Sequence, residues 1–304
     1  MIAITGYSGF VGTELLKKIN TEECLLLGRK PILGNYKHQY FDLSNPVQDL
    51  DLNGIKVLVH CAARVHIMDD NSANPIDEFR AVNTKGTLNL AAQAAEAGVK
   101  RFIFVSTIKV NGESTTGRTP FNEQENAPED PYGVSKAEAE QQLLALGQQA
   151  DMEIVIIRPP LVYGEGVKAN FASLMRLVNK GFPLPFRAIN KNKRSLVSVY
   201  NLVDLIKICV EHPAAANQVF LVSDDHDLST AEMVQLMAKV QGKSNWALPV
   251  PPALFSLAGA IFGKKQVVDR LIGSLQVDIT HTKITLNWAP PYSVEDGFKF
   301  SAKI

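Results

Sequence analysis

A glycine-rich turn at the start of the chain limits the possible folds more than any other feature. The apolar segment Ile2–Thr5 runs directly into Gly6-Tyr7-Ser8-Gly9-Phe10-Val11-Gly12 and then into TELLKKI, a helical pattern. The first glycine permits a tight turn, the second lets a pyrophosphate approach the backbone, and the third lets the helix pack on the strand. Amides at the helix N-terminus then bind the phosphates. The spacing favours a dinucleotide-binding turn over a simple βα turn, with Gly6, Gly9, Phe10, Val11 and Gly12 as the cofactor-binding residues.

Short apolar runs alternate with longer helical patterns through the first half of the chain. This alternation predicts βαβ units and a parallel sheet with right-handed crossovers. The expected strands are Ile2–Thr5, Cys24–Leu27, Val57–His60, Phe102–Ser106 and Ile154–Arg158, and the expected helices are Val11–Ile19, Phe79–Ala97 and Ser135–Gln149.

The second half is less regular. Segments 162–170 and 180–193 are rich in Gly, Pro, Asn and Lys and are expected to be loops around a helix at Phe171–Val178. A strand at Val219–Val222 and a helix capped by Ser229 follow. The predicted fold is α/β, a Rossmann doubly wound parallel sheet over residues 1–165 with segments returning near 195–225. Residues 166–304 are expected to form mainly a smaller C-terminal substrate-binding lobe.

Charge balance restricts the partners. Lys and Arg number 31, as do Asp and Glu, so the formal net charge is zero. No domain-wide positive field is expected to attract nucleic acid, and an anionic ligand must be held by local groups. The cysteines Cys24, Cys61 and Cys209 lie in apolar runs and are expected to be buried reduced thiols.

Targeting and membrane signals are weak. The N-terminus shows no secretory pattern, so we expect a cytoplasmic protein. The longest apolar segment, Leu248–Gly263, carries three prolines near its start and is too short to span a membrane. We expect a helix packed on the protein there, with contact to a membrane surface as the alternative.

The end of the second strand bears on the choice of cofactor. An acidic residue there would bind the ribose hydroxyls and repel a 2′-phosphate, but the chain has Gly28 followed by Arg29 and Lys30. Because a guanidinium pairs well with a phosphate, Arg29 favours NADP(H), with NAD(H) the alternative.

A tyrosine and a lysine are placed for proton transfer. Tyr132 and Lys136 are four residues apart in a helical pattern and share one face. We expect the lysine cation to lower the pKa of the phenol toward neutrality. Thr107 follows the strand that ends at Ser106, where its hydroxyl would hydrogen-bond the reacting oxygen of a substrate.

Five segments together resemble the extended short-chain dehydrogenase/reductase family, also called the NAD-dependent epimerase/dehydratase family. They are TGYSGFVG, VHCAARVH, FIFVSTIKVNG, PYGVSKAEAE and IIRPPLVYGEG, and the resemblance covers nearly the whole chain. It implies that Thr107, Tyr132 and Lys136 are catalytic and that Asn83 supports the site. It also implies that the dinucleotide contacts Asp42, Leu43, Cys61, Ala62, Ala63, Tyr132, Lys136 and Pro159.

Within this family the chain is most similar to bacterial enzymes that make UDP-N-acetyl-6-deoxyhexoses for surface polysaccharide, some of which are described as UDP-glucose 4-epimerases. STIKVNGE and RLIGSLQVD carry this likeness. Dehydratases of the family have an acidic pair after the threonine, but this chain has Ile108-Lys109, so dehydration is not expected. Asn111 stands where many epimerases have tyrosine, which weakens the case for an epimerase.

Local cations suit a substrate diphosphate. The resemblance places a diphosphate-binding arginine at Arg194 and a second contact at Asn170, which precedes a helix. Lys109 is a further candidate substrate contact. The histidines and cysteines show no metal-binding spacing, so no metal is expected.

Four hypotheses follow. The leading one is a reductase of UDP-4-keto-6-deoxy-N-acetylhexosamines that acts at C4, with Tyr132 as proton donor. The second is a UDP-sugar 4-epimerase with retained NAD. The third is a non-catalytic NADP-binding sensor, and the fourth is an enzyme for a steroid or flavonoid, suggested by the apolar stretch near Leu254–Phe262. The resemblance also implies a homodimer formed through helices Phe79–Ala97 and Ser135–Gln149.

Overall fold

A seven-stranded parallel sheet forms the centre of the computed structural model, which describes residues 1–45, 48–65, 74–167, 169–244 and 246–302. The strand order is β3-β2-β1-β4-β5-β6-β9, so the direction of winding reverses between β1 and β4. Ligands of such sheets bind at this reversal, outside the carboxyl ends of the strands. The predicted Rossmann fold is confirmed. The strands are β1 (Ile2–Thr5), β2 (Cys24–Gly28), β3 (Lys37–Tyr40), β4 (Val57–His60), β5 (Arg101–Val105), β6 (Glu153–Arg158) and β9 (Gln218–Leu221).

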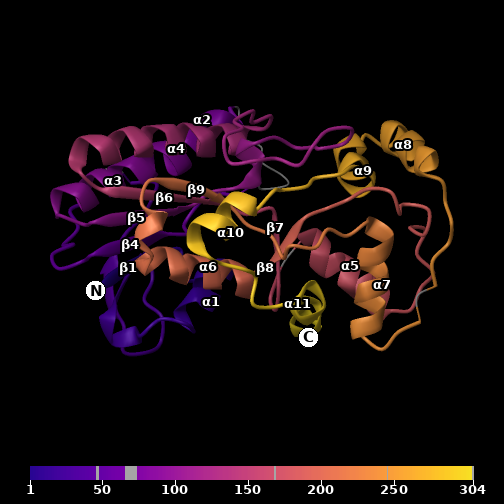
Figure 1. Cartoon of the computed structure of the whole chain (residues 1–304), viewed down its shortest axis with the longest axis horizontal. Coiled ribbons are helices and arrows are strands. Elements are labelled where there is room, and N and C mark those ends of the chain that lie inside the picture. Colours follow the sequence, from indigo (N-terminus) through magenta and orange to yellow (C-terminus); the bar gives the residue numbers. More distant parts are fainter. Residues whose placement is uncertain (46–47, 66–73, 168, 245, 303–304) are drawn as a thin grey trace.

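Helices cover both faces of this sheet (Figure 1). On one face lie α3 (Thr87–Glu96) and α4 (Pro131–Ala150), and on the other lie α1 (Phe10–Leu16) and α6 (Val199–Glu211). Successive residues of a strand enter opposite layers, so Phe102 packs under α3 and α4 while Ile103 packs under α1 and α6. Both faces are therefore apolar, as a parallel sheet buried on two sides requires.

A second, two-stranded parallel sheet joins β7 (Leu161–Tyr163) to β8 (Leu196–Ser198). The rings of Tyr163, Phe171 and Phe298 pack beside it with centroids 4.8–5.4 Å apart. The prediction of a loop over 162–170 was therefore wrong at both ends, where β7 and α5 (Ala169–Asn179) lie, and is confirmed over residues 164–167. The helices next to this sheet are α5, α7 (Thr230–Val240) and α11 (Val294–Ser301). Other elements of the chain are η1 (Thr21–Glu23), η3 (Ile108–Val110), η4 (Pro213–Ala215), α9 (Lys265–Ile272) and α10 (Thr280–Leu286).

The single helix expected over Phe79–Ala97 is three segments. A short α2 (Pro75–Phe79) leads into a π-helical turn, η2 (Arg80–Gly86), before α3 begins. A Cβ on Gly86 would lie 2.1 Å from the carbonyl oxygen of Leu43, so the helix passes this loop at a distance that only glycine allows. π-turns widen a helix locally and are frequent at functional sites.

The apolar segment Leu248–Gly263 differs from its prediction. It does form a helix, α8 (Pro252–Ile261), which packs on the protein on one side only, so that most of its residues are exposed. In Figure 1, α8 and α9 project at the upper right, away from the main sheet. By contrast, the expected helix after Ser229 is confirmed as α7, and Ser229 and Glu232 form its capping box.

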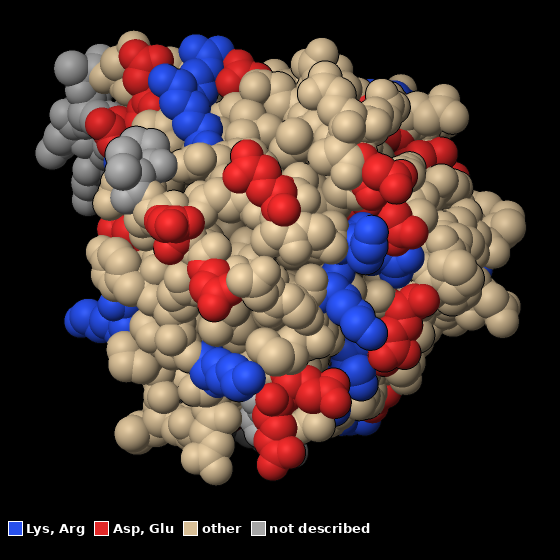
Figure 2. Space-filling view, turned by 90° about the vertical axis from the view of Figure 1, so that its left-hand side faces the viewer, with Lys and Arg blue, Asp and Glu red and all other residues tan. Residues whose placement is uncertain are grey.

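The mixed surface charge agrees with the sequence, and so do two of the three thiols, whereas Cys61 is half-buried. Figure 2 shows one face of the molecule on which both signs of charge are interspersed. The cysteines are free, and Cys24 and Cys209 are buried. Among the described residues, no helix has the length and apolar character needed to cross a membrane.

Candidate active site

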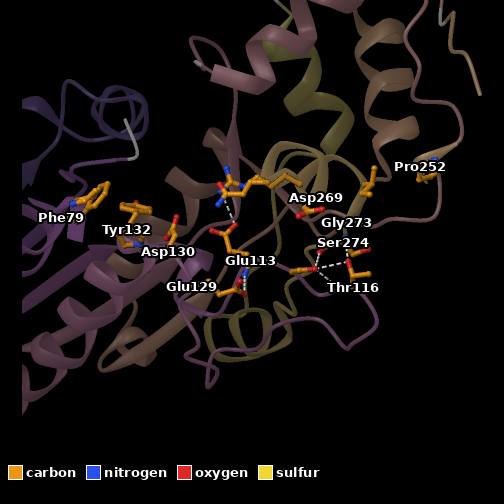
Figure 3. Close-up of a pocket in the computed structure, with 16 residues that line it drawn as sticks. Phe79, Glu113, Thr116, Glu129, Asp130, Tyr132, Pro252, Asp269, Gly273 and Ser274 are labelled. Carbon is orange, nitrogen blue, oxygen red and sulfur yellow. Dashed lines mark hydrogen bonds and ion pairs between the residues drawn. The ribbon is translucent and has the colours of Figure 1, made fainter. Parts of the chain in front are cut away.

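A pocket of about 860 Å³ opens at the N-terminal end of α4. In Figure 3, Tyr132 and Phe79 lie on one side of this pocket, and Asp269 and Gly273 lie on the other. The Tyr132 ring packs against Phe79 with centroids 6.0 Å apart, which fixes the phenol at the pocket wall. Glu113, Ser114 and Thr116, which follow β5 and η3 in the chain, line this pocket, whereas the glycine turn after β1 does not.

The glycine turn is closed by backbone contacts. A Cβ on Gly6 would lie 2.5 Å from the amide nitrogen of Ala62, and one on Gly12 would lie 2.2 Å from the carbonyl oxygen of Gly6. Gly9, in contrast, is exposed at the N-cap of α1, and no side chain caps the first amides of that helix. The turn therefore presents free amide donors on an open surface, which fits the diphosphate of a dinucleotide.

The segments that carry Thr107 and Tyr132 are packed together. Gly133 lies so close to η3 that its Cβ would be 2.8 Å from the carbonyl oxygen of Lys109. Asp130 caps α4 by accepting a hydrogen bond of 2.6 Å from the Gly133 amide, and Thr107 Oγ1 accepts one of 3.3 Å from the Lys109 amide. The two predicted catalytic hydroxyls thus stand on the adjoining starts of η3 and α4.

Lys136 is buried behind this junction. Its Nζ donates a 2.8 Å hydrogen bond to the carbonyl oxygen of Val105 and lies 3.7 Å from the centroid of the Phe104 ring. Burial lowers the pKa of Lys136 to about 7, against the opposing effect of Glu140. The ammonium is therefore only partly charged at neutral pH.

The prediction that Lys136 lowers the pKa of Tyr132 is wrong for this state of the protein. Burial raises the pKa of Tyr132 above its ordinary value, and the negative charge of Asp130 raises it further. A lysine that is itself desolvated and bonded to a carbonyl contributes too little positive charge to offset these effects. Tyr132 is consequently a neutral phenol, and in this form it is a proton donor.

A buried polar network beneath the site was not predicted. Arg158 forms a bidentate ion pair with Glu140, with a shortest N–O distance of 2.6 Å, and Ser106 Oγ also donates to Glu140. Arg158 donates to Asn111 Oδ1 at 3.1 Å, while Asn111 Nδ2 donates to the Asn122 carbonyl at 2.6 Å. The sequence signal was a charge at the end of an apolar strand, Arg158 in β6, whereas Glu140 in α4 is one of several polar residues of its helix.

This network changes the meaning of Asn111. Both ends of its amide bond to the protein interior, and Asn111 does not line the pocket. The absence of a tyrosine at this position therefore gives no argument against an epimerase. Ser106 is likewise committed to Glu140, which leaves Thr107 as the hydroxyl of this segment nearest the surface.

Asn83 of the π-turn connects the loop after β4 to α4. Its amide exchanges hydrogen bonds with the backbone of Arg64 at 2.8 and 3.0 Å and donates one of 3.1 Å to Ser135 Oγ. This loop also holds Cys61, Ala62 and Ala63, the expected dinucleotide contacts, beside the glycine turn. On the opposite side of β5, the Pro159 carbonyl accepts a 2.9 Å hydrogen bond from the Ile108 amide.

Gly28 has a structural explanation. The ring of Tyr7 lies over it, so a Cβ on Gly28 would come within 2.7 Å of that ring, and the Tyr7 hydroxyl donates to the Lys30 carbonyl. Packing against Tyr7 therefore accounts for the missing acidic residue. Arg29 is exposed, and its charge helps to lower the pKa of Asp42, although the hydrogen bonds from Ser44 lower it more. Asp42 and Leu43 thus lie in a loop near Arg29 and η2.

The predicted substrate cations are engaged by protein groups. Lys109 Nζ pairs with Glu113 Oε1 at 2.7 Å and with Asp130, and Glu113 also lies 3.5 Å from Arg270. Arg194 donates to the carbonyl oxygen of Arg270 at 2.8 Å. Lys109 and Arg194 are thereby brought to opposite ends of one cluster centred on Glu113, a residue that sequence reasoning missed.

Two further predictions about the site concern Asn170 and metals. Asn170 falls within α5, but its side chain lies outside the described part of the chain. The described residues contain no group of three or more His, Cys, Asp or Glu side chains placed to hold a metal ion.

Comparisons with known proteins give a consistent result. Residues 2–223 match the model of the NAD dependent epimerase/dehydratase family. The chain is 55% identical to the UDP-glucose 4-epimerase of Vibrio cholerae over 99% of this chain and 94% of that protein. It is 30% identical to the N-acetyl-alpha-D-glucosaminyl-diphospho-ditrans,octacis-undecaprenol 4-epimerase of Escherichia coli O157:H7, over 97% of this chain and 92% of that protein.

Among solved structures, the UDP-glucose 4-epimerase of Thermotoga maritima with UDP-glucose superposes with a TM-score of 0.79 at 20% identity. The match covers 99% of this chain and 97% of that chain. At this identity the likeness shows the shared fold, including the part that follows residue 165.

Proposed function

The chain belongs to the NAD dependent epimerase/dehydratase family, and from that premise we propose that it is a 4-epimerase of UDP-linked sugars. The observation that carries this proposal is the 55% identity to the Vibrio cholerae UDP-glucose 4-epimerase over nearly the full length of both chains. It favours the second hypothesis of the sequence analysis over the first, the 4-ketoreductase.

Two sequence arguments against an epimerase lose their weight. The position of Asn111 is explained by the Arg158 network, and the glycine at position 28 is explained by the Tyr7 ring. Arg29 still favours a cofactor with a 2′-phosphate, because it is the exposed cation that follows β2. A retained NAD is the expected cofactor of an epimerase, so the identity of the bound dinucleotide separates the two hypotheses.

In the proposed reaction, a dinucleotide held at the glycine turn would supply the hydride chemistry, accepting a hydride from C4 of the sugar and giving it back to the other face. Tyr132 Oη exchanges the proton of the C4 hydroxyl, and Thr107 Oγ1 hydrogen-bonds the same oxygen. Because the pKa of Tyr132 is raised, it must lose its own proton before it accepts one. Lys136, four residues away with a pKa of about 7, exchanges protons at neutral pH and favours the phenolate while it is charged.

The carrier of the sugar has a second candidate. The Escherichia coli relative is named for a sugar on undecaprenyl diphosphate, and the apolar helix α8 begins at Pro252, which lines the pocket. A lipid-linked sugar presents the same diphosphate to the Glu113 cluster but lacks the uridine. We therefore propose the UDP-sugar first and the polyprenyl-linked sugar second.

One experiment tests the function. The purified protein is denatured, the released dinucleotide is identified, and native protein is incubated with UDP-glucose, UDP-N-acetylglucosamine and N-acetylglucosaminyl-diphospho-undecaprenol without added cofactor. Released NAD(H) and formation of a 4-epimer support the proposal, and the substrate that turns over identifies the carrier. Consumption of added NADPH with a UDP-4-keto sugar, without epimerisation, would establish the reductase instead.

We also propose a homodimer through α3 and α4, which lie side by side on one face of the sheet (Figure 1). Gln141, Gln142 and Ala145 leave an exposed strip on α4. Light scattering after gel filtration would give twice the chain mass of 33.3 kDa, and Ala145→Arg would reduce it to that mass. A monomeric wild-type protein would exclude this interface.

A further inference from the structure

Most of the surface of helix α8 is apolar and exposed to solvent. From Pro252 to Gly263 the chain carries no charged residue. The exposed fractions are 53% for Leu254, 58% for Leu257, 69% for Ile261 and 73% for Phe262. Contiguous exposed apolar surface of this kind marks an interaction site in a folded protein.

The packing of α8 determines which side stays exposed. Its small-residue side rests on α9, where a Cβ on Gly259 would come within 2.8 Å of Val268. Phe255 turns inward and stacks on Phe186 with centroids 5.9 Å apart. Leu254, Leu257 and Ile261 are three and four residues apart, so they form one stripe on the outer side of the helix.

The charges beside this stripe indicate what covers it. Lys264 and Lys265 follow directly and are exposed, while no acidic residue occurs between Pro252 and Val268. An apolar helix with cations at one end fits the boundary between lipid tails and anionic headgroups. A helix of ten residues is about 15 Å long, half of the hydrocarbon thickness, so it lies in the surface and does not span it.

We propose that α8 and Phe262 insert into the surface of an anionic lipid bilayer, with Lys264 and Lys265 against the headgroups. Pro252 at the start of α8 and Arg270 of α9 line the same pocket as Tyr132. The contact therefore places the mouth of the pocket beside the bilayer. This binding does not depend on the proposed reaction, and it holds whether or not the protein is an epimerase.

Vesicle flotation tests the proposal with the full-length protein. Wild type is mixed with vesicles of phosphatidylcholine alone or of phosphatidylcholine with phosphatidylglycerol, and bound protein is measured at low and high salt. We expect binding to the anionic vesicles, weakened by salt. The double variant Leu257→Glu/Ile261→Glu is expected to lower the partition coefficient at least about tenfold. Lys264→Glu/Lys265→Glu is expected to remove the preference for anionic lipid.

Ile284→Glu is the matched control, because Ile284 is 76% exposed on α10, outside this surface. It is expected to bind vesicles as wild type does, and circular dichroism of each variant checks that the fold is intact. Absence of wild-type binding to anionic vesicles, or equal binding by Leu257→Glu/Ile261→Glu, overturns the proposal. A wild-type oligomer that Leu257→Glu/Ile261→Glu dissociates, without vesicle binding, would identify a second copy of the chain as the occupant and would also overturn it.

Discussion

The part of the candidate site that is predicted to hold the cofactor (the cofactor side) and the part that is predicted to hold the substrate (the substrate side) are held together in different ways. On the cofactor side, Gly6, Gly12 and Gly133 let backbone segments touch at distances that exclude a Cβ, and Lys136 is sealed beneath them. On the substrate side, the predicted cations are held by ion pairs such as Lys109–Glu113. Most residues of the nearby helix α8 are exposed to solvent. Close packing has one solution, whereas partly exposed ion pairs rearrange at little cost. The cofactor side is thus built in advance, and the substrate side has room to adapt.

Substitution of Gly12 by valine is the severest test of this difference. The new Cβ would meet the Gly6 carbonyl at 2.2 Å, and both atoms belong to the backbone. We expect the turn to open, dinucleotide binding to be lost, and the free energy of unfolding to fall by more than about 3 kcal/mol. Calorimetric binding and urea unfolding measure both.

The control for this test is Gly54→Ala, where no atom lies within 4 Å of the added Cβ and only its positive φ of 75° resists the change. It should cost about 1 kcal/mol of stability and leave binding unchanged. Normal binding by Gly12→Val would mean that the turn is not closely packed.

Tyr132→Phe removes the proton carrier without removing the ring. The contact with Phe79 remains, so we expect a folded protein that retains its dinucleotide. Turnover should fall roughly 10²–10⁴-fold, the usual contribution of a general acid–base group. Tyr40→Phe, at an exposed tyrosine on β3, serves as control and should keep full activity. Unchanged turnover in Tyr132→Phe would mean that another group carries the proton.

Lys136→Met separates function from stability. A buried lysine with a pKa of about 7 binds fewer protons folded than unfolded between pH 7 and its ordinary 10.5, so unfolding takes up a proton. Stability from this group therefore rises with pH across that window, and its penalty is complete below pH 7. We expect Lys136→Met to abolish turnover yet stabilise the protein by about 1–4 kcal/mol at neutral pH, with a smaller gain near pH 10.

Denaturant unfolding at several pH values measures this effect, and Lys100→Met, at an exposed lysine, should change neither stability nor its pH dependence. A destabilised Lys136→Met at neutral pH would mean that the hydrogen bond to Val105 outweighs the burial of charge.

Much of the cofactor side was predictable because its signals are local. The turn after β1 and the strands flanking it follow from glycine spacing and short apolar runs, and β1 and β4 begin and end at the predicted residues. The roles of Thr107, Tyr132 and Lys136 stay predictions, as does the division of the chain at residue 165. What the sequence could not supply was the state of Lys136, because desolvation depends on β5 and α4 packing together.

The substrate side was harder to predict because its contacts join distant segments. Glu113 meets Lys109 nearby in the chain but Arg270 far from it, so no spacing rule indicates the cluster. The exposure of α8 could not be predicted either, because the sequence of an apolar segment predicts a helix but not which other segments pack against it. The packing reason for Gly28 was hidden in the same way, because the ring that lies over it comes from Tyr7.

Arg29→Ala examines the exposed cation that directly follows β2 and is predicted to contact a 2′-phosphate. Loss of a charged hydrogen-bond donor should weaken NADP(H) binding about tenfold and leave NAD(H) binding unchanged. Fluorescence titration with both cofactors measures the ratio, and Lys56→Ala, an exposed cation just before the amino end of β4, is the control. Equal affinities in wild type and variant would show that Arg29 does not contact the cofactor and that Gly28 reflects the packing of Tyr7 alone.

Glu113→Gln should have the smallest effect, and it addresses the substrate side directly. Removing the carboxylate charge frees Arg270 and leaves Lys109 paired with Asp130 alone, so both cations are more available to a substrate diphosphate and the KM should fall about threefold, the scale of a partly exposed ion pair. Unfolding free energy should change by no more than about 0.5 kcal/mol, since these side chains are partly exposed.

Glu125→Gln breaks a comparable ion pair, with Arg118, away from the pocket and should leave the KM unchanged. A higher KM in Glu113→Gln would mean that Glu113 positions the two cations for the substrate. The substrate side would then be built in advance as well, and the difference between the two sides would lie only in how each is held, by backbone contact or by charge.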